Sequence, residues 1–319
     1  MKAAVITSFE ADPSYGDFPE PQPTAGEVVL DVLASGLHRL VRGRAAGRHY
    51  SSSTGLPQVA GVDGVGRLPD GTAVWFSGVR SPWGAMAEHA SVPEIGCVPL
   101  PSGADPAQVA GQVNPALSSW MALTARAELA AGQSVAGQSV AVLGATGSSG
   151  RQAIQIARLL GAGEVWALGR NPEALAELPD LGADHLVRLD AEGVPAALPD
   201  GEVDVVLDYL WGPPAQALLG ALLARRPDPA RALTWVQIGG MAGPNLSLPA
   251  SALRSHNLRL VGSGIGSVPA TTMLRELPRI LAEIAAGRLA APVRAVPLRD
   301  TAVAWSTAEL PGERVVLVP

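Results

Sequence analysis

Three glycines spaced three residues apart mark the part of the chain whose chemistry is easiest to infer. They lie in Gly144-Ala-Thr-Gly-Ser-Ser-Gly150, after an apolar run and before a helical run from about Ser148 to Leu160. Glycine lets the chain turn sharply, lets a phosphate approach the backbone, and lets a helix pack closely on a strand. The first turn of that helix would aim free N–H groups at an anion. The residues predicted to line this pyrophosphate site are Gly144, Thr146, Gly147, Ser148, Ser149 and Gly150.

A lone glycine-rich turn also occurs as simple punctuation between a strand and a helix, so the context decides. A second strand, Glu164 to Gly169, follows the helix and ends at Arg170. A site for NAD usually carries Asp or Glu at this position to accept from the ribose hydroxyls. Here no carboxylate repels a 2′-phosphate, and a guanidinium is placed to bind one with charge-assisted hydrogen bonds. Gly169 and Arg170 therefore favour NADP(H), the alternative being that Arg170 is a surface residue flanking a helix.

Composition limits the classes of protein to consider. The chain has 319 residues, 47% hydrophobic and 16% charged, which predicts about two well-buried globular domains. A net charge of −6 argues against nucleic acid as a partner, and no apolar run predicts a membrane span, so the cytoplasm is the expected location. Cys97 and Lys2 are the only residues of their types. An intrachain disulfide, a cysteine-rich metal site, a P-loop and an interior Schiff-base lysine are thus excluded.

The positions of Pro, Gly and apolar residues predict two kinds of domain. Residues 1–115 read as short strands separated by turns, which resembles a compact barrel-like β domain. Strands and helices then alternate, which predicts a doubly wound parallel sheet of the Rossmann type. Its predicted strands are Ser139 to Gly144, Glu164 to Gly169, His185 to Leu189, Val203 to Leu210, Thr234 to Gly239 and Leu258 to Gly262. With a helix near 270–287 assigned to this part, the predicted domains are 1–115, completed by 290–319, and 116–289.

Several motifs together resemble one family along nearly the whole chain. They are Met1-Lys-Ala-Ala-Val5, Gly26-Glu-Val28, Gly61-Val-Asp-Gly-Val-Gly66, the nucleotide turn, and Val203-Asp-Val-Val-Leu-Asp208. In combination they are similar to the medium-chain dehydrogenase/reductase superfamily, and within it to the zinc-independent quinone oxidoreductases. This resemblance implies an α/β protein in which a GroES-like β-rich catalytic domain joins a Rossmann domain. It also implies a homodimer formed through the edge of the Rossmann sheet, for which Leu258 to Gly262 is the expected strand.

Departures from the zinc-bearing members of that superfamily are equally informative. His38 stands where those relatives have Cys, and Gly61-Val62-Asp63 stands where they have Gly-His-Glu. Near Asn114, where their third ligand falls, the chain offers no Cys or His. A catalytic zinc needs three protein ligands, and His38 with Asp63 are too few. We therefore expect no metal.

Without a Lewis acid, a conjugated acceptor is easier to reduce than a simple ketone, because negative charge spreads onto a distant oxygen. We therefore expect NADPH-dependent hydride transfer to a small quinone or α,β-unsaturated carbonyl. From its place in the resemblance, His38 is expected to donate to the substrate oxygen or to relay a proton, with Tyr50 as a second candidate and Asp63 holding a donor in place. The plainer readings are a core histidine bonded to a backbone carbonyl, a tyrosine that caps a loop, and an ordinary turn aspartate.

Further cofactor contacts are expected at the carboxyl ends of later strands, where ligands bind in such sheets. These residues are Tyr209, Gly239, Gly240 and Met241, and also Ser263 and Gly264, whose turn resembles one that flanks the nicotinamide in relatives. Two other functions stay open. One is a biosynthetic enzyme with non-redox chemistry, such as a cyclisation or an elimination, and the other is a non-catalytic NADPH-binding protein.

Overall fold

The computed structural model describes residues 1–127, 135–198, 200–307 and 312–319. Their contacts divide the chain into two compact units, Met1–Asn114 with Ala270–Pro319, and Pro115–Pro269. Helix α7 (Ala270–Ala285) contacts β8 (Cys97–Pro99) and belongs to the first unit, whereas the sequence suggested a domain limit after residue 289. An amphipathic pattern shows that one face of a helix is buried but does not say against which element.

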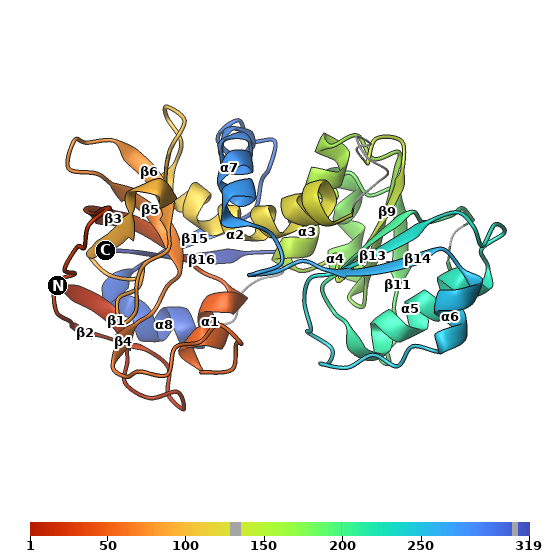
Figure 1. The fold of residues 1–319 in the computed structure, drawn as a ribbon, viewed down its shortest axis with the longest axis horizontal. Helices are drawn as coiled ribbons and strands as arrows, with labels where there is room; N and C mark the ends of the chain where they lie inside the picture. Colours follow the sequence, from red (N-terminus) through yellow and green to blue (C-terminus); the bar gives the residue numbers. More distant parts are fainter. Residues whose placement is uncertain (128–134, 199, 308–311) are drawn as a thin grey trace. The chain divides into compact units, whose positions relative to one another are not determined.

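The first unit is built on β-structure (Figure 1). The remaining strands are β1 (Lys2–Ile6), β2 (Ser14–Asp17), β3 (Glu27–Leu37), β4 (Gln58–Val59), β5 (Asp63–Arg67), β6 (Ala73–Ser77), β7 (His89–Pro93), β15 (Val293–Pro297) and β16 (Arg314–Val318). One sheet follows the order β15-β16-β3-β5-β6-β8, with β7 paired to β3, and a smaller sheet has the order β2-β1-β4. Among the strands described for this unit, β15 and β16 pair in parallel and all other pairs are antiparallel.

The long strand β3 organises this unit, because it pairs with β5, β7 and β16. Its last residue, Leu37, lies opposite Val315 and is completely buried, so the end of the chain joins the sheet beside the start of α1 (Arg39–Ala45). Leu37 packs with Val41 of α1 and Trp305 of α8 (Thr301–Ser306) in one apolar cluster. This packing fixes α1, and with it the residue that precedes α1, His38.

The second unit holds a six-stranded sheet in the order β11-β10-β9-β12-β13-β14, with every neighbouring pair parallel. Its strands are β9 (Ser139–Leu143), β10 (Glu164–Gly169), β11 (His185–Arg188), β12 (Val205–Asp208), β13 (Leu233–Gln237) and β14 (Leu258–Gly262). Counted from β9, this is the order 3-2-1-4-5-6 of a Rossmann fold. The predicted doubly wound parallel sheet is confirmed, with strand limits that differ from the predicted ones by a few residues at most.

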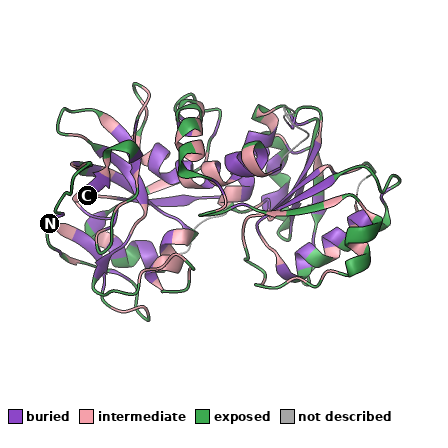
Figure 2. Ribbon diagram, in the orientation of Figure 1, coloured by how far each residue is buried: buried purple, intermediate pink, exposed green. Residues whose placement is uncertain are grey.

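Both faces of this sheet are covered by helices. Ala141 and Leu143 of β9 pack on one face with Leu218 of α5 (Gly212–Ala224). Side chains alternate along a strand, so Val140 and Val142 face the opposite side, where α3 (Ser148–Leu159) contacts β9. The central strands β9, β10, β12 and β13 are almost entirely buried (Figure 2), as parallel sheets require, whereas the outer strands β11 and β14 are largely exposed.

The limit between the two units falls within helix α2 (Pro106–Met121). The other helical segments have three to six residues and are η1 (Glu94–Gly96), the π-helical turn η2 (Ala122–Arg126), α4 (Pro172–Ala176), η3 (Leu178–Leu181), α6 (Ala250–Ser255) and η4 (Leu298–Asp300). Within the described ranges, no helix is long and apolar enough to cross a membrane.

Candidate functional site

The glycine turn follows β9 at the point where the strand order of the sheet reverses. From β9 the chain proceeds to β10 on one side, while β12 lies on the other side, so the carboxyl ends of β9 and β12 are neighbours with divergent connections. In open α/β sheets this switch point is where ligands bind. Gly144 and Tyr209 directly follow these two strands.

The turn depends on glycine at both of its ends. Gly144 has a φ of +95°, a left-handed conformation that disfavours other residues. At Gly150, an added Cβ would lie 2.3 Å from the Gly144 carbonyl oxygen and 2.6 Å from the Ala145 Cα. The first turn of α3 therefore packs directly on the backbone that leaves β9.

The start of α3 has the features of an anion site. Its N-cap is Gly147, which carries no side chain that could accept from the first turn and is exposed to solvent. The amides of Gly144 and Ala145 are already used, because both donate to the Leu168 carbonyl, at 3.0 Å and 2.9 Å. The Gly147 amide donates to the Gly144 carbonyl oxygen at 3.2 Å. The partial positive charge of the helix start is thus presented at residues 148–150, beside the half-buried Thr146.

Gly169 and Arg170 end the neighbouring strand β10. A Cβ on Gly169 would lie 2.8 Å from Thr146 Cγ2, so glycine at this position makes room for the turn. Arg170 is exposed, and within the described ranges no carboxylate forms an ion pair with it. The next residue, Asn171, caps α4 by accepting from the Glu173 amide at 2.9 Å. Arg170 is therefore a helix-flanking arginine, as in the plainer reading, and its guanidinium is also open to an anion.

Tyr209 occupies the corresponding position after β12, and it is 8% exposed. Its hydroxyl lies 2.6 Å from Ser119 Oγ, and Ser119 also donates to the Ser149 carbonyl at 3.3 Å. Burial raises the pKa of Tyr209 to about 12, so the phenol stays neutral. Ser119 thus joins Tyr209 to the first turn of α3, a link between residues 90 positions apart that sequence reasoning missed.

Asp208 is a second residue that sequence reasoning used only as part of a motif. Its carboxylate is fully buried and accepts from the Leu210 and Trp211 amides, at 2.8 Å each, and from the Trp235 indole N–H at 2.9 Å. Burial raises the pKa of Asp208 despite these donors. The two amide bonds hold Trp211 at a φ of +56°, the only non-glycine residue with a positive φ in the described chain.

The remaining predicted cofactor residues lie at the ends of β13 and β14. A Cβ on Gly239 would lie 2.7 Å from the Tyr209 carbonyl oxygen, so the chain after β13 passes close to the turn after β12. Gly240 and Met241 follow and are exposed, and the Met241 amide donates to the same oxygen at 3.4 Å. Ser263 is buried and its amide donates to the Gln237 carbonyl at 2.8 Å, while Gly264 is exposed. All the predicted cofactor residues thus lie at or just after the carboxyl ends of strands of the parallel sheet.

In the first unit, His38 and Asp63 form a buried pair. His38 is the N-cap of α1 and Asp63 is the first residue of β5, and they are 3% and 4% exposed. His38 Nε2 lies 2.9 Å from Asp63 Oδ1, while His38 Nδ1 is buried and has no hydrogen-bond partner among the described residues. The partner of His38 is thus a carboxylate and not the backbone carbonyl of the plainer reading. Ser35 Oγ donates to the Asp63 carbonyl at 2.9 Å and holds this segment in place.

Tyr50, the second predicted donor, differs from this pair in its environment. It is 73% exposed, and its ring packs against that of His49 with 4.2 Å between the ring centroids. His49 Nδ1 accepts from the Ser51 amide at 3.2 Å, which favours the neutral imidazole, and burial lowers the pKa of His49.

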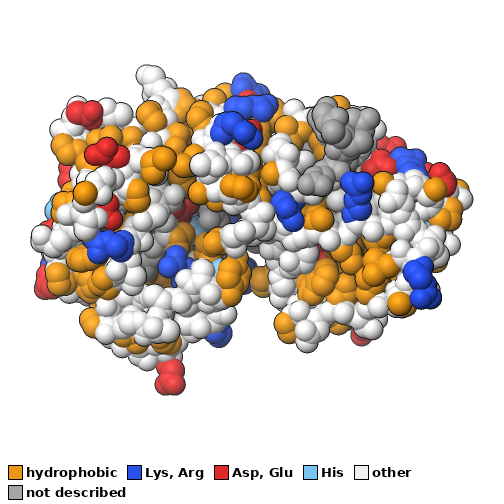
Figure 3. Space-filling model, viewed as in Figure 1, with side chains coloured by type: hydrophobic (Ala, Val, Ile, Leu, Met, Phe, Trp, Pro, Cys, Tyr) orange, Lys and Arg blue, Asp and Glu red, His pale blue; other side chains and the backbone are white. Residues whose placement is uncertain are grey.

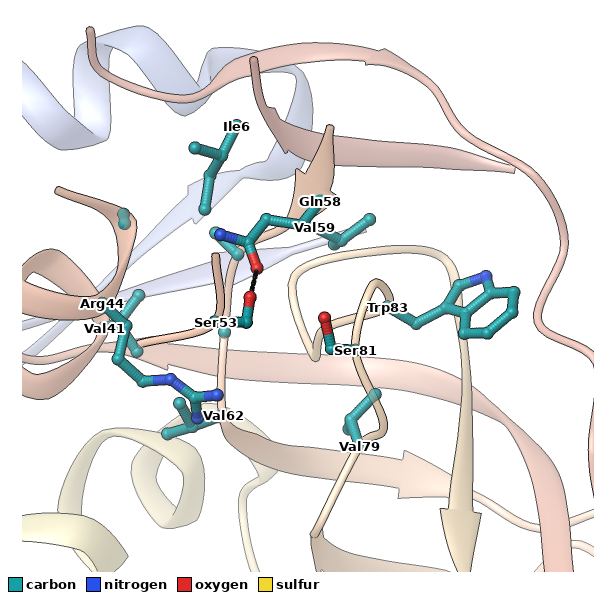
Figure 4. Close-up of a pocket in the computed structure, with 13 residues that line it drawn as sticks. Ile6, Val41, Arg44, Ser53, Gln58, Val59, Val62, Val79, Ser81 and Trp83 are labelled. Atoms are coloured by element: carbon teal, nitrogen blue, oxygen red, sulfur yellow. Dashed lines mark hydrogen bonds between the residues drawn. The ribbon is translucent and has the colours of Figure 1, made fainter. Parts of the chain in front are cut away.

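A pocket lies within the first unit, between α1 and the segments near residues 58–62 and 79–83 (Figure 4). Arg44 and Val41 of α1 line it, together with Gln58, Ser53 and Val62. Gly61 allows the turn in its wall, with a φ of +98° and a Cβ position only 2.7 Å from the Met86 amide nitrogen. Val62 connects this wall to Asp63. The described residues contain no group of three or more His, Cys, Asp or Glu side chains arranged to hold a metal ion.

Comparisons with known proteins agree with this architecture. A family model described as a zinc-binding dehydrogenase matches residues 150–283. The chain is 34% identical, over 367 aligned positions covering all of both chains, to tdiC of Emericella nidulans, described as a probable NADPH-dependent quinone reductase.

Solved structures are similar over the whole chain as well. The quinone oxidoreductase of Thermus thermophilus, also studied in complex with NADPH, is 27% identical with a TM-score of 0.79, covering 100% of both chains. A probable oxidoreductase from Mycobacterium abscessus, at 24% identity and a TM-score of 0.77, covers 100% of this chain and 99% of its own and supports the fold. With one relative 34% identical from end to end, the chain belongs to the medium-chain dehydrogenase/reductase superfamily, among its quinone oxidoreductase-like members.

Proposed function

We propose that this protein is an NADPH-dependent oxidoreductase that transfers hydride to a quinone or an α,β-unsaturated carbonyl without a metal. The observation that carries the proposal is the glycine turn at the switch point of a Rossmann sheet, in a chain 34% identical throughout to a probable NADPH-dependent quinone reductase. The proposal extends to the substrate class, for which both that relative and the Thermus structure are named.

The residues of the second unit fit NADP(H). We assign the pyrophosphate to the backbone of residues 144–150, where a Cβ on Gly150 would close the turn and where the N-cap of α3 has no side chain. We assign the 2′-phosphate to Arg170, whose exposed guanidinium is open to an anion. We assign the nicotinamide side to Tyr209, Gly239, Gly240, Met241, Ser263 and Gly264 at the same strand edge.

Bound NADPH supplies the hydride, and each quinone reduced to a hydroquinone also takes up one proton. We assign the supply of that proton to His38. Because the Asp63 carboxylate accepts from Nε2–H, it fixes the tautomer and stabilises an imidazolium, and the exchangeable proton is then carried on Nδ1. Since His38 is 3% exposed, a relay role suits it better than direct contact with the acceptor, and the exposed Tyr50 stays the candidate for direct donation.

Metal-free chemistry is supported by the side chains at the positions where zinc-bearing members of the superfamily carry ligands. Val62 has no ligand atom, no Cys or His lies near Asn114, and His38 Nε2 and Asp63 Oδ1 are hydrogen-bonded to each other. The residues matched by the zinc-binding family model, 150–283, include none of these positions. We expect exhaustive dialysis against a chelator to leave activity unchanged, and a loss that zinc restores would refute this part of the proposal.

The test of function measures the oxidation of NADPH by 1,4-benzoquinone and by a panel of enones, through the loss of the absorbance of NADPH. Rapid oxidation that requires the acceptor is the expected result. Tight NADPH binding without turnover across the panel would favour a non-redox enzyme or a binding protein instead.

The role of His38 is tested with His38→Ala and Asp63→Asn. We expect both variants to lose kcat, by about 10²-fold or more for His38→Ala, with little change in KM, since general acid–base catalysis contributes about that much. Asp63→Asn should lose kcat because it removes the carboxylate that fixes the tautomer of His38. A His38→Ala variant with full kcat/KM would refute the assignment.

We further propose a cytoplasmic homodimer formed through β14. This strand ends the sheet order, and exposed apolar residues lie on it and beside it, namely Leu260, Leu253 and Ile265. Figure 3 shows hydrophobic side chains gathered on this unit near α5 and β14. Light scattering of the wild type and of Leu260→Glu should give a dimer and a monomer, and two species of equal mass would refute the interface.

A further inference from the structure

The pocket of the first unit holds one positive charge with no counter-charge. Arg44 extends from α1 toward Val62 and the segment that carries Ser53 (Figure 4). It is half-buried, and within the described ranges no side chain or carbonyl oxygen forms a hydrogen bond or ion pair with its guanidinium. None of the described residues that line the pocket is acidic.

A second donor faces the same space. Gln58 is 8% exposed, and its Oε1 accepts the hydroxyl of Ser53, which orients the amide. This bond leaves the Gln58 Nε2 group turned away from Ser53 (Figure 4), and no hydrogen bond from it is found among the described residues. A half-buried guanidinium without an acceptor is costly, and the Gln58 amide is a further donor beside it, so together they indicate a ligand that supplies the acceptors.

The residues around Arg44 provide no negative charge that would offset its partial loss of hydration. Burial lowers the pKa of the Arg44 guanidinium, which still remains charged at neutral pH. His49 gives no counter-charge, because an imidazole is either neutral or positive, and its pKa is lowered first by burial and then by the charge of Arg44. The charge has therefore lost part of its hydration without gaining a partner, which strengthens its attraction for an anion.

We propose that Arg44 and Gln58 form a subsite for a carboxylate carried by the acceptor substrate, so that the preferred quinone or enone is an acidic one. The planar fork of a guanidinium matches a carboxylate in a bidentate geometry, and the Gln58 amide adds a third donor. Arg44 lies on the helix capped by His38, six residues or about 9 Å along the helix axis, and Val62 precedes Asp63. The subsite is thus attached to both segments that carry the proposed proton relay, and the inference rests on the proposed function.

The test compares 1,4-naphthoquinone-2-carboxylate with its uncharged carboxamide, which differ in charge but hardly in shape. The variants are Arg44→Met, which removes the charge, and Arg44→Lys, which keeps it. Arg48→Met is the matched control, because Arg48 is exposed in the turn after α1 and does not line the pocket. We expect Arg44→Met to lower kcat/KM for the carboxylate by about 10- to 100-fold, as loss of a charge-assisted hydrogen-bond pair does. Arg44→Lys should retain part of the preference, and Arg48→Met should retain all of it, while the carboxamide changes little in every variant.

A binding measurement without NADPH separates this inference from the proposed function. Calorimetry with naphthalene-2-carboxylate and naphthalene-2-carboxamide should show that the wild type prefers the carboxylate and that Arg44→Met loses the preference. If neither quinone is reduced but this preference is found, the proposed function fails and the subsite stands. If both quinones are reduced and Arg44→Met affects them equally, or affects neither, the subsite is refuted and the function stands. A loss equal in Arg48→Met would also refute it, because general attraction by surface charge would then explain the preference.

Discussion

Replacing Gly150 with alanine tests the geometry on which the nucleotide site depends. The new Cβ would lie 2.3 Å from the Gly144 oxygen, 2.6 Å from the Ala145 Cα and 2.8 Å from the Ala145 carbonyl carbon, against the 3.4 Å or more of an ordinary contact. All three atoms belong to the backbone, so α3 must move by about 1 Å relative to β9. Overpacking of this kind costs up to about 3 kcal/mol. Alanine in place of a helical glycine returns about 1 kcal/mol, which leaves a net loss of about 2 kcal/mol.

The displacement should weaken NADPH binding more clearly than it weakens the fold. Each charge-assisted hydrogen bond lost to the pyrophosphate is worth about 1.5–3 kcal/mol, so the Kd for NADPH should rise by about 10- to 100-fold. Urea unfolding gives the first quantity, and fluorescence titration with NADPH gives the second.

Gly220→Ala is the matched control for this substitution. Gly220 also lies inside a helix of the same unit, but a Cβ added there would meet nothing within 4 Å. We expect it to stabilise the protein by up to about 1 kcal/mol and to leave the Kd unchanged. If Gly150→Ala behaved like Gly220→Ala in both measurements, the close approach of α3 to the turn would not shape the site, and the reasoning would be wrong.

Three further substitutions test other parts of the account. Arg170→Ala should raise the Kd for NADPH by about 10- to 100-fold and leave the Kd for NADH within about twofold, whereas an equal change for both nucleotides would contradict the 2′-phosphate assignment. Asp208→Asn replaces one accepting oxygen by an NH2 group that cannot accept from the Trp235 indole N–H or the backbone amides, so it should lower the free energy of unfolding in urea by about 1–3 kcal/mol. An unfolding midpoint like that of the wild type would count against the importance of these hydrogen bonds. Hydrogen bonds from the Arg80 guanidinium and then from the Thr24 amide lower the pKa of Glu27 from 4.5 to about 2, so the stabilisation by this carboxylate is complete above pH 4.5 and disappears as the pH falls toward 2. The urea midpoint of Glu27→Gln should therefore fall less steeply than that of the wild type over this range, and parallel curves would refute the assignment.

The features that local sequence could predict are those made by neighbours in the chain. Strand β9, the glycine turn and α3 follow one another within residues 139–159, and their pattern predicts both the elements and the site between them. The same holds for Gly169 and Arg170 at the end of β10. The side of the turn on which a phosphate would bind follows from the direction of the helix alone.

Contacts between distant segments were not predictable in this way. Ser119 meets Tyr209 only because α2 and the end of β12 pack together, and Trp235 meets Asp208 only because β12 and β13 are neighbours. The sequence suggested only that Asp63 holds a donor in place, and the separation of 25 residues gave no local signal that this donor is His38. Arg44 and Gln58 carry no motif, and only the structure shows that they line one pocket and that the Arg44 guanidinium has no acceptor among the described residues.

The most direct test of the central claim uses NADPH carrying deuterium at the transferable position. Purified protein is mixed with this NADPH and 1,4-benzoquinone without oxygen, and the loss of NADPH and the formation of hydroquinone are followed together. We predict one hydroquinone for each NADPH consumed. We also predict a slower single turnover than with unlabelled NADPH, because the bond between carbon and the transferred deuterium breaks in the hydride-transfer step. NADPH that binds but is not oxidised, with quinones or enones alike, would contradict it.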